Sequence, residues 1–191
     1  MSTIHHDSRL IKPGDTFICL PNAEDYVSEA LSKGASDIKR LSRLEMAHYA
    51  ADHFNHPSKK LSVIGITGTN GKTTTTYLIH TLLTLLGFNS YLSGTLTQSL
   101  TTPESIDTQR QMADHLSHGG SHYVMEVSSH AIHQERIAAI DFDVTCLTNI
   151  SQDHLDYHGD FESYKACKLS FLSNYGSKAS ISPDDFHSLP L

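Results

Sequence analysis

The segment "VIGITGTNGKTTTT", from Val63 to Thr76, restricts the fold of this chain more than any other stretch. A short apolar run ends in a glycine-rich turn, and Gly-Lys-Thr then opens a helical pattern. Strand, glycine turn and helix is the order that a phosphate-binding loop needs, because backbone N–H groups and a helix N-terminus must converge on phosphate oxygens. The strict pattern has glycine at position 66, where this chain has isoleucine, so Gly68 is the nearest substitute. A chance glycine turn is the alternative, and it leaves Gly-Lys-Thr at a helix start unexplained.

The loop predicts a site for nucleotide phosphates, which the family resemblance given below implies are those of ATP. Successive N–H groups from Thr69 to Lys72 would hold phosphate oxygens, and the Lys72 ammonium would neutralise the β- and γ-phosphates. The hydroxyl of Thr73 would bind Mg²⁺, which prefers oxygen ligands. The residues expected to contact ATP are Gly68, Thr69, Asn70, Gly71, Lys72, Thr73 and Thr74.

Alternating strand and helix patterns on both sides of this loop predict an α/β fold. A small N-terminal α/β unit is expected over residues 1–59, followed by a partial, mostly parallel, doubly wound sheet over residues 60–191. Strands are expected at 15–20, 61–66, 89–95, 121–129 and 142–150, and again in the tail after residue 176. Helices are expected at 24–35, 43–54, 72–86, about 102–118, and from about 161. Ligands of such sheets bind beyond the carboxyl ends of the strands.

Two helix patterns carry specific expectations. The helix after the loop has an apolar stripe and is closed by Gly87; the stripe consists of Leu78, Ile79, Leu82, Leu83 and Leu86. Thr102 followed by Pro103 is typical of a helix start, and Gly119 of its end.

Composition narrows the function class. The formal net charge of the 191 residues is −7, which argues against non-specific nucleic-acid binding. The three cysteines are scattered without a CxxC pair, so neither a disulfide framework nor a thiolate zinc site is indicated. No apolar run is long enough for a membrane span. A cytoplasmic protein that does not bind membranes is therefore expected.

Two further strand ends carry candidate metal ligands. Glu126 ends an apolar strand, where an unpaired carboxylate would be costly, so we expect it to hold Mg²⁺ together with Thr73. A salt-bridged glutamate is the alternative. His154 and His158 are four residues apart after the last long strand, but the HExxH glutamate of zinc helices is missing and a loop is expected there. A dedicated zinc site is the weaker alternative.

Lys168 is a charge on an apolar helix face. From about Phe161, the helical spacing places Phe161, Tyr164, Lys168 and Leu172 on one side, and Asp160 at the N-cap. A snorkelling lysine with its ammonium in water is one interpretation. If Lys168 instead points inward near cations, burial and like charge both lower its pKa. The neutral amine is the form that reacts with CO₂.

Together these motifs resemble the Mur ligase family. The matching segments are "GTNGKTT", "TTP", "MEVSSHAIHQERI" and "TNISQDHLDYHGDFESYKACK", with closest agreement between Leu61 and Lys168. The start "DSRLIKPGDTFICL" is similar to the uridine-binding domain of that family. The motifs "DHLDYHG" and "EVSSHxxxQxR" indicate the members that add the third residue of the peptidoglycan stem peptide.

The resemblance implies an ATP-dependent ligase of peptidoglycan precursor synthesis. ATP would phosphorylate the γ-carboxylate of D-Glu in UDP-N-acetylmuramoyl-L-Ala-D-Glu. The amine of meso-diaminopimelate or L-lysine would then attack the acyl phosphate, and the tetrahedral intermediate would collapse to a peptide bond. Such chemistry depends on cations that neutralise phosphate and carboxylate oxygens.

Site residues follow from the resemblance by position. Thr73 and Glu126 would hold a first Mg²⁺, and His154 would help to bind a second. Lys168 matches the lysine that the family carbamylates to N6-carboxylysine, so it would act as a carboxylate beside the metal. The implied catalytic set is Lys72, Glu126, His154 and Lys168. The implied UDP-sugar contacts are Ser8, Thr101, Thr102, Ser128, Gln134 and Arg136.

The chain also departs from the family pattern. Leu100 stands where asparagine is frequent, only six residues precede "DSR", and "PNAEDY" compresses a longer segment, so uridine binding is less strongly indicated than ATP binding. The rest of the central domain and the C-terminal amino-acid-binding domain are missing, so we expect a truncated fragment that is inactive alone. A non-catalytic nucleotide- or UDP-sugar-binding fragment is one alternative. A folylpolyglutamate- or cyanophycin-synthetase-like ligase is another, against which "TTP" and "DHLDYHG" speak.

Overall fold

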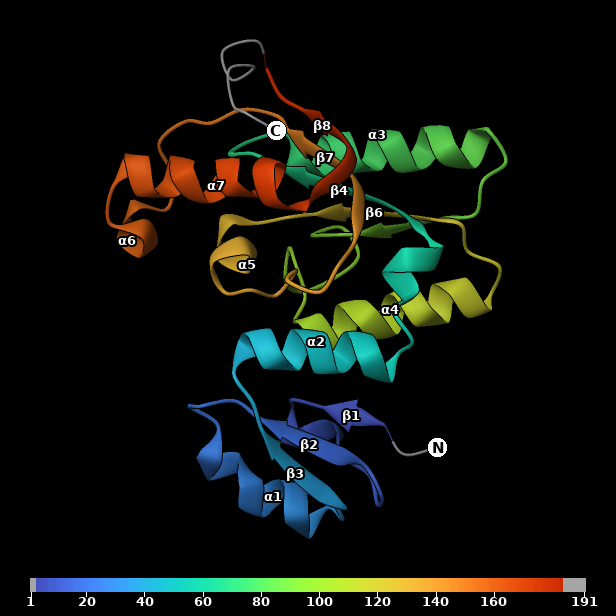
Figure 1. Ribbon diagram of the computed structural model, residues 1–191, viewed down its shortest axis with the longest axis vertical. Helices are drawn as coiled ribbons and strands as arrows, with labels where there is room; N and C mark the ends of the chain where they lie inside the picture. The colour runs from blue at the N-terminus through green and yellow to red at the C-terminus, as the bar shows by residue number, and fades with distance from the viewer. Residues whose placement is uncertain (1–2, 184–191) are drawn as a thin grey trace.

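A small parallel sheet begins the chain in the computed structural model, which describes residues 3–183 (Figure 1). Its strand order is β1-β2-β3, with β1 Ile4–His5, β2 Thr16–Cys19 and β3 Asp37–Arg40. The helical elements between them are the 3-10 helices Ser8–Leu10 and Glu24–Tyr26 and the helix α1, Val27–Ser32. The expected strand at 15–20 is confirmed. The strands β1 and β3 were not predicted, because one is two residues long and the other, "DIKR", has a single apolar residue.

Helix α2, Arg43–His53, leads from this sheet to the larger one. Its start is fixed by a capping box: the Ser42 hydroxyl accepts a hydrogen bond from the Glu45 N–H, and the Glu45 carboxylate accepts one from the Ser42 N–H. A 3-10 turn, Pro57–Lys60, follows. The helix predicted at 43–54 is therefore confirmed.

The second sheet has five strands, all parallel, in the order β5-β6-β4-β7-β8. In chain order its elements are β4 Ser62–Thr67, α3 Lys72–Leu85, β5 Ser90–Ser93, α4 Ser105–Ser117, β6 His122–Glu126, α5 Ser129–His133, β7 Phe142–Leu147, α6 Leu155–His158, α7 Phe161–Tyr175 and β8 Gly176–Ile181. The expected α/β class with a doubly wound parallel sheet is confirmed. In the strand register Ile66 lies opposite Glu126, and Thr67 opposite Leu147, so the carboxyl ends of β4, β6 and β7 meet at one edge.

The main core lies on one face of this sheet, against α4, α5 and α7. Gly65 shows how tight it is, because a Cβ there would lie 2.6 Å from ring atoms of both Phe142 and Phe171. The fully enclosed side chains in this cluster include Val63, Met112, Tyr123, Met125, Ala131, Phe142 and Phe171. Close packing of this kind leaves no room for another side chain at position 65.

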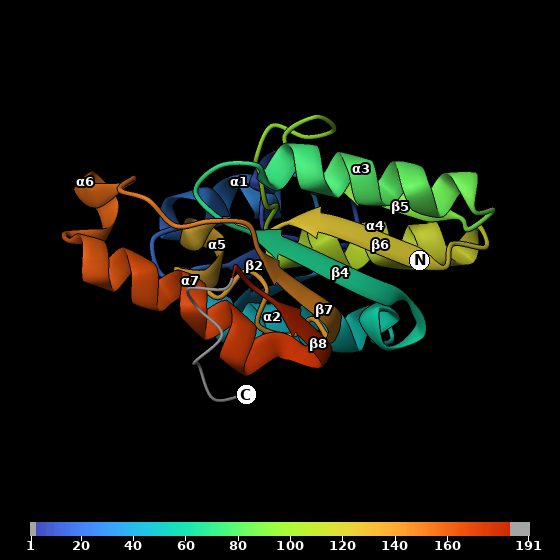
Figure 2. The same ribbon diagram turned by 90° about the horizontal axis from the view of Figure 1, so that it is seen from above.

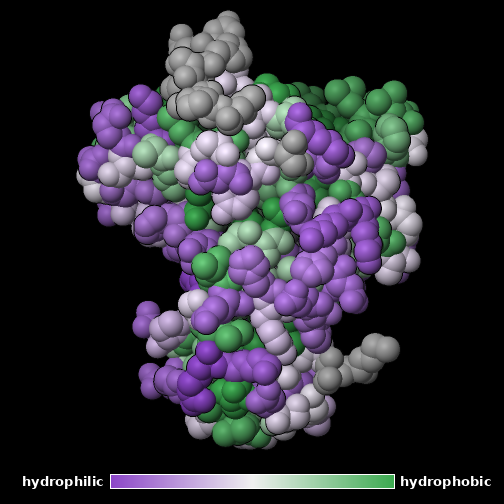
Figure 3. Space-filling model, in the orientation of Figure 1, coloured by the Kyte–Doolittle hydropathy of each residue, from purple (hydrophilic) through white to green (hydrophobic). Residues whose placement is uncertain are grey.

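Helix α3 packs on the other face of the sheet (Figure 2). Right-handed crossovers explain the separation, since the chain moves one way from β4 to β5 and back from β5 through β6 and β7 to β8. The bounds of α3 and the closing Gly87, at φ +87°, agree with the prediction. Its stripe does not form a buried face: Thr76 is the only buried residue of α3, and Leu78, Leu82 and Leu86 are exposed. Figure 3 shows the resulting apolar surface over α3.

Three local expectations need correction. Helix α4 begins at Ser105 with Glu104 as N-cap, later than "TTP" predicted, and the Thr102 hydroxyl bonds instead to the Glu126 carbonyl. The short helix α5 directly after β6 was not predicted. The segment expected as a loop after β7 contains one helical turn, α6.

Helix α7 begins where it was predicted. Asp160 is its N-cap, and Oδ1 accepts a hydrogen bond of 2.7 Å from the Ser163 N–H. Tyr164, Lys168 and Leu172 are buried, as the helical spacing indicated, and Phe161 is half-buried. The tail strand is β8, while most of the turn expected after it lies outside the described residues. Within residues 3–183, no helix is long and apolar enough to cross a membrane.

Candidate active site

The glycine loop lies between the carboxyl end of β4 and α3. Gly68 has φ +147°, and a Cβ there would lie 1.9 Å from the Thr148 hydroxyl, so glycine is required. Gly71, at φ +83°, is the N-cap of α3. The strand-to-helix context that the phosphate-loop prediction needs is therefore present.

Residues after β7 hold this loop in shape. The Thr148 hydroxyl and the Asn149 amide both donate to the Asn70 carbonyl, at 2.6 and 3.0 Å. The Asn70 N–H donates to Asn149 Oδ1, and the Thr69 N–H donates to the Asn149 carbonyl, both at 3.0 Å. Two of the N–H groups expected to bind phosphate are thus already used. The first N–H groups of a helix lack intrahelical partners. The N–H groups of Gly71–Thr74 are therefore the candidates for binding a phosphate.

Lys72 folds back over the loop. Its Nζ donates to the carbonyl oxygens of Gly68, at 2.7 Å, and Thr69, at 3.0 Å. Burial lowers the pKa of Lys72, although Glu126 and Asp153 act in the opposite direction. The ammonium therefore sits at the loop, where a phosphate would displace these carbonyl contacts.

Glu126 is buried at the end of β6, yet it is neither unpartnered nor salt-bridged. Its Oε1 accepts from the Thr95 N–H at 2.9 Å and the Thr95 hydroxyl at 2.8 Å, while Oε2 accepts from the Thr73 hydroxyl at 2.8 Å. A Cβ on Gly94 would lie 2.2 Å from Oε1, so the sequence "SGT" fits around the carboxylate. Thr73 and Glu126 thus lie together, and two adjacent oxygen donors beside a phosphate loop suit Mg²⁺, which commonly takes its remaining ligands from phosphates and water.

Lys168 points inward from α7 and is only 1% exposed. Its Nζ donates to the Gly68 carbonyl at 2.8 Å, so both lysines share this oxygen, and lies 4.9 Å from the centre of the Tyr164 ring. The Tyr164 hydroxyl shares a 2.9 Å hydrogen bond with Thr69. Burial, and secondly the charge of Lys72, lower the pKa of Lys168 to about 7. The snorkelling interpretation is therefore wrong, and the lowered pKa agrees with the sequence argument.

Three histidines lie close together beside Lys168. His154, in a left-handed backbone conformation at φ +51°, has its ring 4.9 Å from that of His130. His158 shares a 3.0 Å hydrogen bond with the Ser129 hydroxyl. Burial, followed by neighbouring charges that include other histidines, lowers the pKa of both His130 and His158. Over residues 3–183, no group of three or more His, Cys, Asp or Glu side chains is arranged to hold a metal ion.

One pocket of about 290 Å³ brings together three of the four predicted catalytic residues and four of the six expected UDP-sugar contacts. It is lined by Lys72, Leu100, Thr101, Thr102, Ser128, Ser129, His130, Arg136, His154 and Lys168. These residues come from α3, from the loops before α4 and α6, from α5 and its flanks, and from α7. The pocket therefore joins expected phosphate, metal and UDP-sugar contacts at the carboxyl edge of the sheet. Leu100, the departure from the family pattern, lies in its wall.

Two of the expected UDP-sugar contacts lie elsewhere. Ser8 donates a 2.6 Å hydrogen bond to Glu29 and lines a separate pocket of about 430 Å³ in the N-terminal unit, with Arg9 and Tyr26. Gln134 lines a third pocket, of about 510 Å³, with residues of the N-terminal unit that include Arg43. The six expected UDP-sugar contacts are therefore divided among three pockets.

Several residues with direct contacts in the site were missed. They are Thr95, Glu104, His130, Thr148, Asn149 and Tyr164. The available signal was position: Thr95 and Thr148 each lie near the carboxyl end of an expected strand, at 89–95 and 142–150, and the carboxyl ends of strands in a parallel sheet meet.

Residues 66–188 match the family model described as the Mur ligase middle domain, which is well over half of the chain. This chain belongs to the Mur ligase family. The resemblance drawn from the loop, "TTP", "MEVSSH" and "DHLDYHG" is thereby confirmed at the level of the family.

Sequence relatives agree with this membership. The UDP-N-acetylmuramoyl-L-alanyl-D-glutamate–2,6-diaminopimelate ligase of Pseudomonas putida is 36% identical over 87% of this chain and 40% of its own length. The ligase of the same name from Geobacter metallireducens is 39% identical over 89% of this chain and 39% of its own length. The Mur ligase chain described here thus spans about 40% of the length of these curated relatives.

Solved Mur ligases share the fold. A structure of a UDP-N-acetylmuramoyl-L-alanyl-D-glutamate–2,6-diaminopimelate ligase superposes with a TM-score of 0.77 at 22% identity, over 98% of this chain and 49% of that one. The structure of MurF ligase from Thermotoga maritima in complex with ADP superposes with a TM-score of 0.69 at 19% identity, over 97% of this chain and 46% of that one. The structure of FolC of Escherichia coli in complex with DHPP and ADP superposes with a lower TM-score of 0.53 at 21% identity, over 68% of this chain and 39% of that one.

Proposed function

We propose that this chain is the nucleotide- and UDP-sugar-binding part of an ATP-dependent ligase that adds the third stem-peptide residue to UDP-N-acetylmuramoyl-L-Ala-D-Glu. The observation that carries the proposal is the pocket in which Lys72 and Lys168 lie together with Thr102, Ser128 and Arg136. Two lysines at a phosphate loop share this pocket with a guanidinium and hydroxyls, which suits a reaction between a phosphate and a carboxylate.

Each residue has a role in this proposal. Lys72 and the N–H groups of Gly71–Thr74 bind the β- and γ-phosphates of ATP and hold the γ-phosphate toward the D-Glu carboxylate. Arg136 binds the anionic sugar-peptide substrate, with Thr101, Thr102, Ser128 and Gln134 beside it, and Ser8 contacts the uridine end. Thr73 and Glu126 would hold a Mg²⁺ ion, which neutralises phosphate oxygens when bound. His154 would contribute to a second such site.

Lys168 acts as a carboxylate in the proposed reaction. Its neutral Nζ attacks CO₂, an N–C bond forms, and one proton leaves the nitrogen to give N6-carboxylysine. A pKa lowered to about 7 keeps a large fraction of the amine neutral at physiological pH. The carbamate would then replace the contact with the Gly68 carbonyl and face the cations instead.

Peptide-bond formation belongs to the longer enzyme in this proposal. Residues 1–59 form the shortened uridine-binding domain and residues 60–191 an incomplete ATP-binding domain, while a further domain supplies the site for the incoming amino acid. The names of the sequence relatives support meso-diaminopimelate over L-lysine. Substrates such as ATP and a UDP-sugar point to the cytoplasm. The coverage of about 40% of the relatives supports a second candidate, a binding fragment without catalysis.

Ligand binding to the purified chain tests the proposal. Mg·ADP should bind, and Lys72→Ala should raise its Kd at least about tenfold, because a charge-assisted contact to phosphate is lost. Lys59→Ala, in the 3-10 turn Pro57–Lys60 at the amino edge of the sheet, is the matched control and should bind normally. Equal Kd values for wild type and Lys72→Ala would contradict the proposed loop function.

A product assay tests whether peptide-bond formation requires the longer enzyme. With ATP, Mg²⁺, UDP-N-acetylmuramoyl-L-Ala-D-Glu and meso-diaminopimelate, the chain alone should release no tripeptide product by mass spectrometry. Detectable product would show that the chain is catalytic by itself.

A further inference from the structure

Glu104 is a buried carboxylate, and helix capping does not explain why it lies there. It is the N-cap residue of α4, but its side chain makes no capping hydrogen bond; its backbone carbonyl accepts from Thr108 instead. The residue is 8% exposed. A buried carboxylate needs compensating partners, so its contacts should show why it is there.

Each oxygen of Glu104 meets a different arginine. Oε2 accepts a short hydrogen bond from Nη1 of Arg43, the first residue of α2. Oε1 lies 3.2 Å from Nε of Arg136, an ion pair without a hydrogen bond. One carboxylate therefore joins the helix that follows the N-terminal sheet to the arginine that follows α5.

The remaining nitrogens of Arg136 are also fixed. Nη1 donates to the Thr102 carbonyl at 3.0 Å, and Nη2 donates to Gln134 Oε1 at 2.6 Å. Thr102 is tied in turn to Ser128, since its hydroxyl accepts from the Ser128 N–H at 3.0 Å. The guanidinium is thus held in one orientation by residues that themselves line the pockets.

The charged groups of Arg43, Glu104 and Arg136 link residues that line two different pockets. Arg136 lines the 290 Å³ pocket with Lys72 and Lys168, whereas Arg43 lines the 510 Å³ pocket with Gln134. One carboxylate between two guanidiniums leaves one net positive charge, and the two guanidiniums line different pockets. That charge suits an anionic ligand that extends through both.

We propose that Glu104 is a positioning residue: it orients Arg136 toward the anionic sugar-peptide ligand and, through Arg43, makes that orientation depend on the docking of the N-terminal unit. This inference rests on the proposed function, in which Arg136 binds the UDP-sugar substrate. Preorganisation of the guanidinium removes part of the ordering cost of binding.

Titration calorimetry with three probes tests the inference: UDP-N-acetylmuramoyl-L-Ala-D-Glu, UDP and Mg·ADP. Glu104→Gln should raise the Kd of the sugar-dipeptide about tenfold, as expected when a charged partner in a buried network is lost. The Kd values for UDP and Mg·ADP should stay within about twofold, since neither probe needs Arg136. Arg43→Gln should cause a smaller loss, because Oε1 still faces Arg136.

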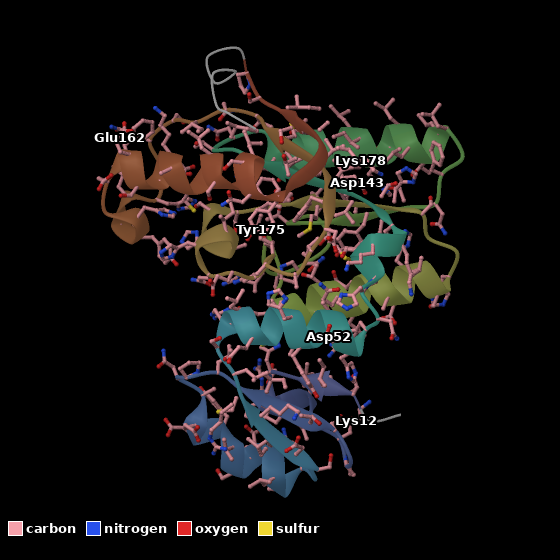
Figure 4. The ribbon with its side chains drawn as sticks, in the orientation of Figure 1. Lys12, Asp52, Asp143, Glu162, Tyr175 and Lys178 are labelled. Atoms are coloured by element: carbon pink, nitrogen blue, oxygen red, sulfur yellow. The ribbon has the colours of Figure 1, made fainter. Side chains whose placement is uncertain are left out.

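A double-mutant cycle distinguishes positioning from folding. If Glu104 acts through Arg136, Glu104→Gln added to Arg136→Lys should weaken sugar-dipeptide binding by no more than about twofold further. Asp143→Asn is the matched control, because Asp143 is also a part-buried ion-paired carboxylate, bonded to Lys178 between β7 and β8 (Figure 4). It should leave all three Kd values unchanged.

Three results would overturn the inference. Wild-type affinity of Glu104→Gln for the sugar-dipeptide, or additive losses in the cycle, would show that Glu104 does not act through Arg136. Equal weakening of all three probes with a lower Tm would show a purely structural role. If the wild-type chain binds UDP and Mg·ADP but not the sugar-dipeptide, the assignment of Arg136 under the proposed function fails first.

Discussion

At the scale of single residues, Lys168 shows how much a buried charge depends on its surroundings. The helical spacing places it on the inner face of α7, where the Gly68 carbonyl, the Thr67 hydroxyl and the Tyr164 ring partly compensate its desolvation. Lys72 adds a second positive charge on the same carbonyl oxygen. The pKa of about 7 is the consequence of burial first and of that charge second.

Replacing this lysine tests the electrostatic cost. Because the pKa of Lys168 is lowered from 10.5 to about 7, the unfolded chain binds more protons between these values, and folding stability rises with pH across that window. The stability cost of burying the Lys168 charge is present in full below about pH 7 and disappears above about pH 10.5. Lys168→Met should therefore raise the free energy of unfolding by about 2 kcal/mol at pH 6, with part of the gain lost to the missing hydrogen bonds.

Urea unfolding of both variants at pH 6, 8 and 10 measures the effect. The advantage of Lys168→Met should shrink as pH rises. Lys165→Met, one turn earlier on a half-buried position of the same helix, is the control and should show no pH-dependent difference. An advantage that stays constant with pH would contradict the assigned pKa.

Glu126 is a second buried charged group, and its partners differ from those that its sequence position predicted. Its position at a strand end predicted a metal ligand or a salt bridge, whereas three hydrogen bonds from Thr73 and Thr95 satisfy it. Thr95 is 31 positions away in the sequence, so no local pattern connects the two. The predicted pair of Thr73 and Glu126 is brought together, while their function as Mg²⁺ ligands stays a prediction.

At the scale of elements, α3 has an apolar surface with no cover in the described chain. Leu85 is 78% and Leu82 58% exposed, and no acidic or basic residue follows Lys72 within the helix other than His80. An exposed apolar surface of this kind favours association in water.

Charged substitutions on α3 should therefore improve solubility. Leu82→Glu with Leu85→Lys should reduce binding of the dye ANS and the sedimentation-averaged mass of the chain, with Tm changed by no more than a few degrees, because neither side chain is buried. Leu147→Lys, at a buried position of β7, is the contrasting variant and should unfold the protein. Unchanged ANS binding in the double variant would show that the surface is covered in solution.

At the scale of the whole molecule, the two sheets share an apolar contact. Ile106 of α4 is fully buried in a cluster with Ile4 and Ile18 of the small sheet and Met46 and Ala50 of α2. Arg110 of α4 also donates to the Ile4 carbonyl at 2.6 Å. The N-terminal unit therefore packs on α4 through α2 (Figure 1), beside the Arg43–Glu104–Arg136 contacts.

This contact predicts coupled unfolding. Ile106→Ala should cost about 2–5 kcal/mol, the range for large-to-small core substitutions, and should weaken both units together. Urea transitions followed by tyrosine fluorescence and by circular dichroism should coincide in the wild type. Two separated transitions in the wild type would show that the sheets unfold independently.

The sequence by itself determined the elements whose physics is local. The glycine loop, the strand-helix alternation, the Asp160 cap and the inward spacing of Lys168 depend on residues within one or two turns of each other. The family also followed from short motifs. The short polar strands β1 and β3 and the helix α5 carry too few periodic residues to be recognised in this way.

Only the tertiary structure decided which distant groups meet. The use of Thr69 and Asn70 N–H groups by Asn149, the Thr95 contacts of Glu126 and the arginines on Glu104 each join different strand ends or units. The order of the strands in the sheet decides which of these groups come into contact. A sequence pattern does not say how the strands pair or in which register. The same reason explains α3: its apolar stripe can be read from the sequence, but its burial depends on which neighbour lies over the helix, and that is a property of the assembled sheet.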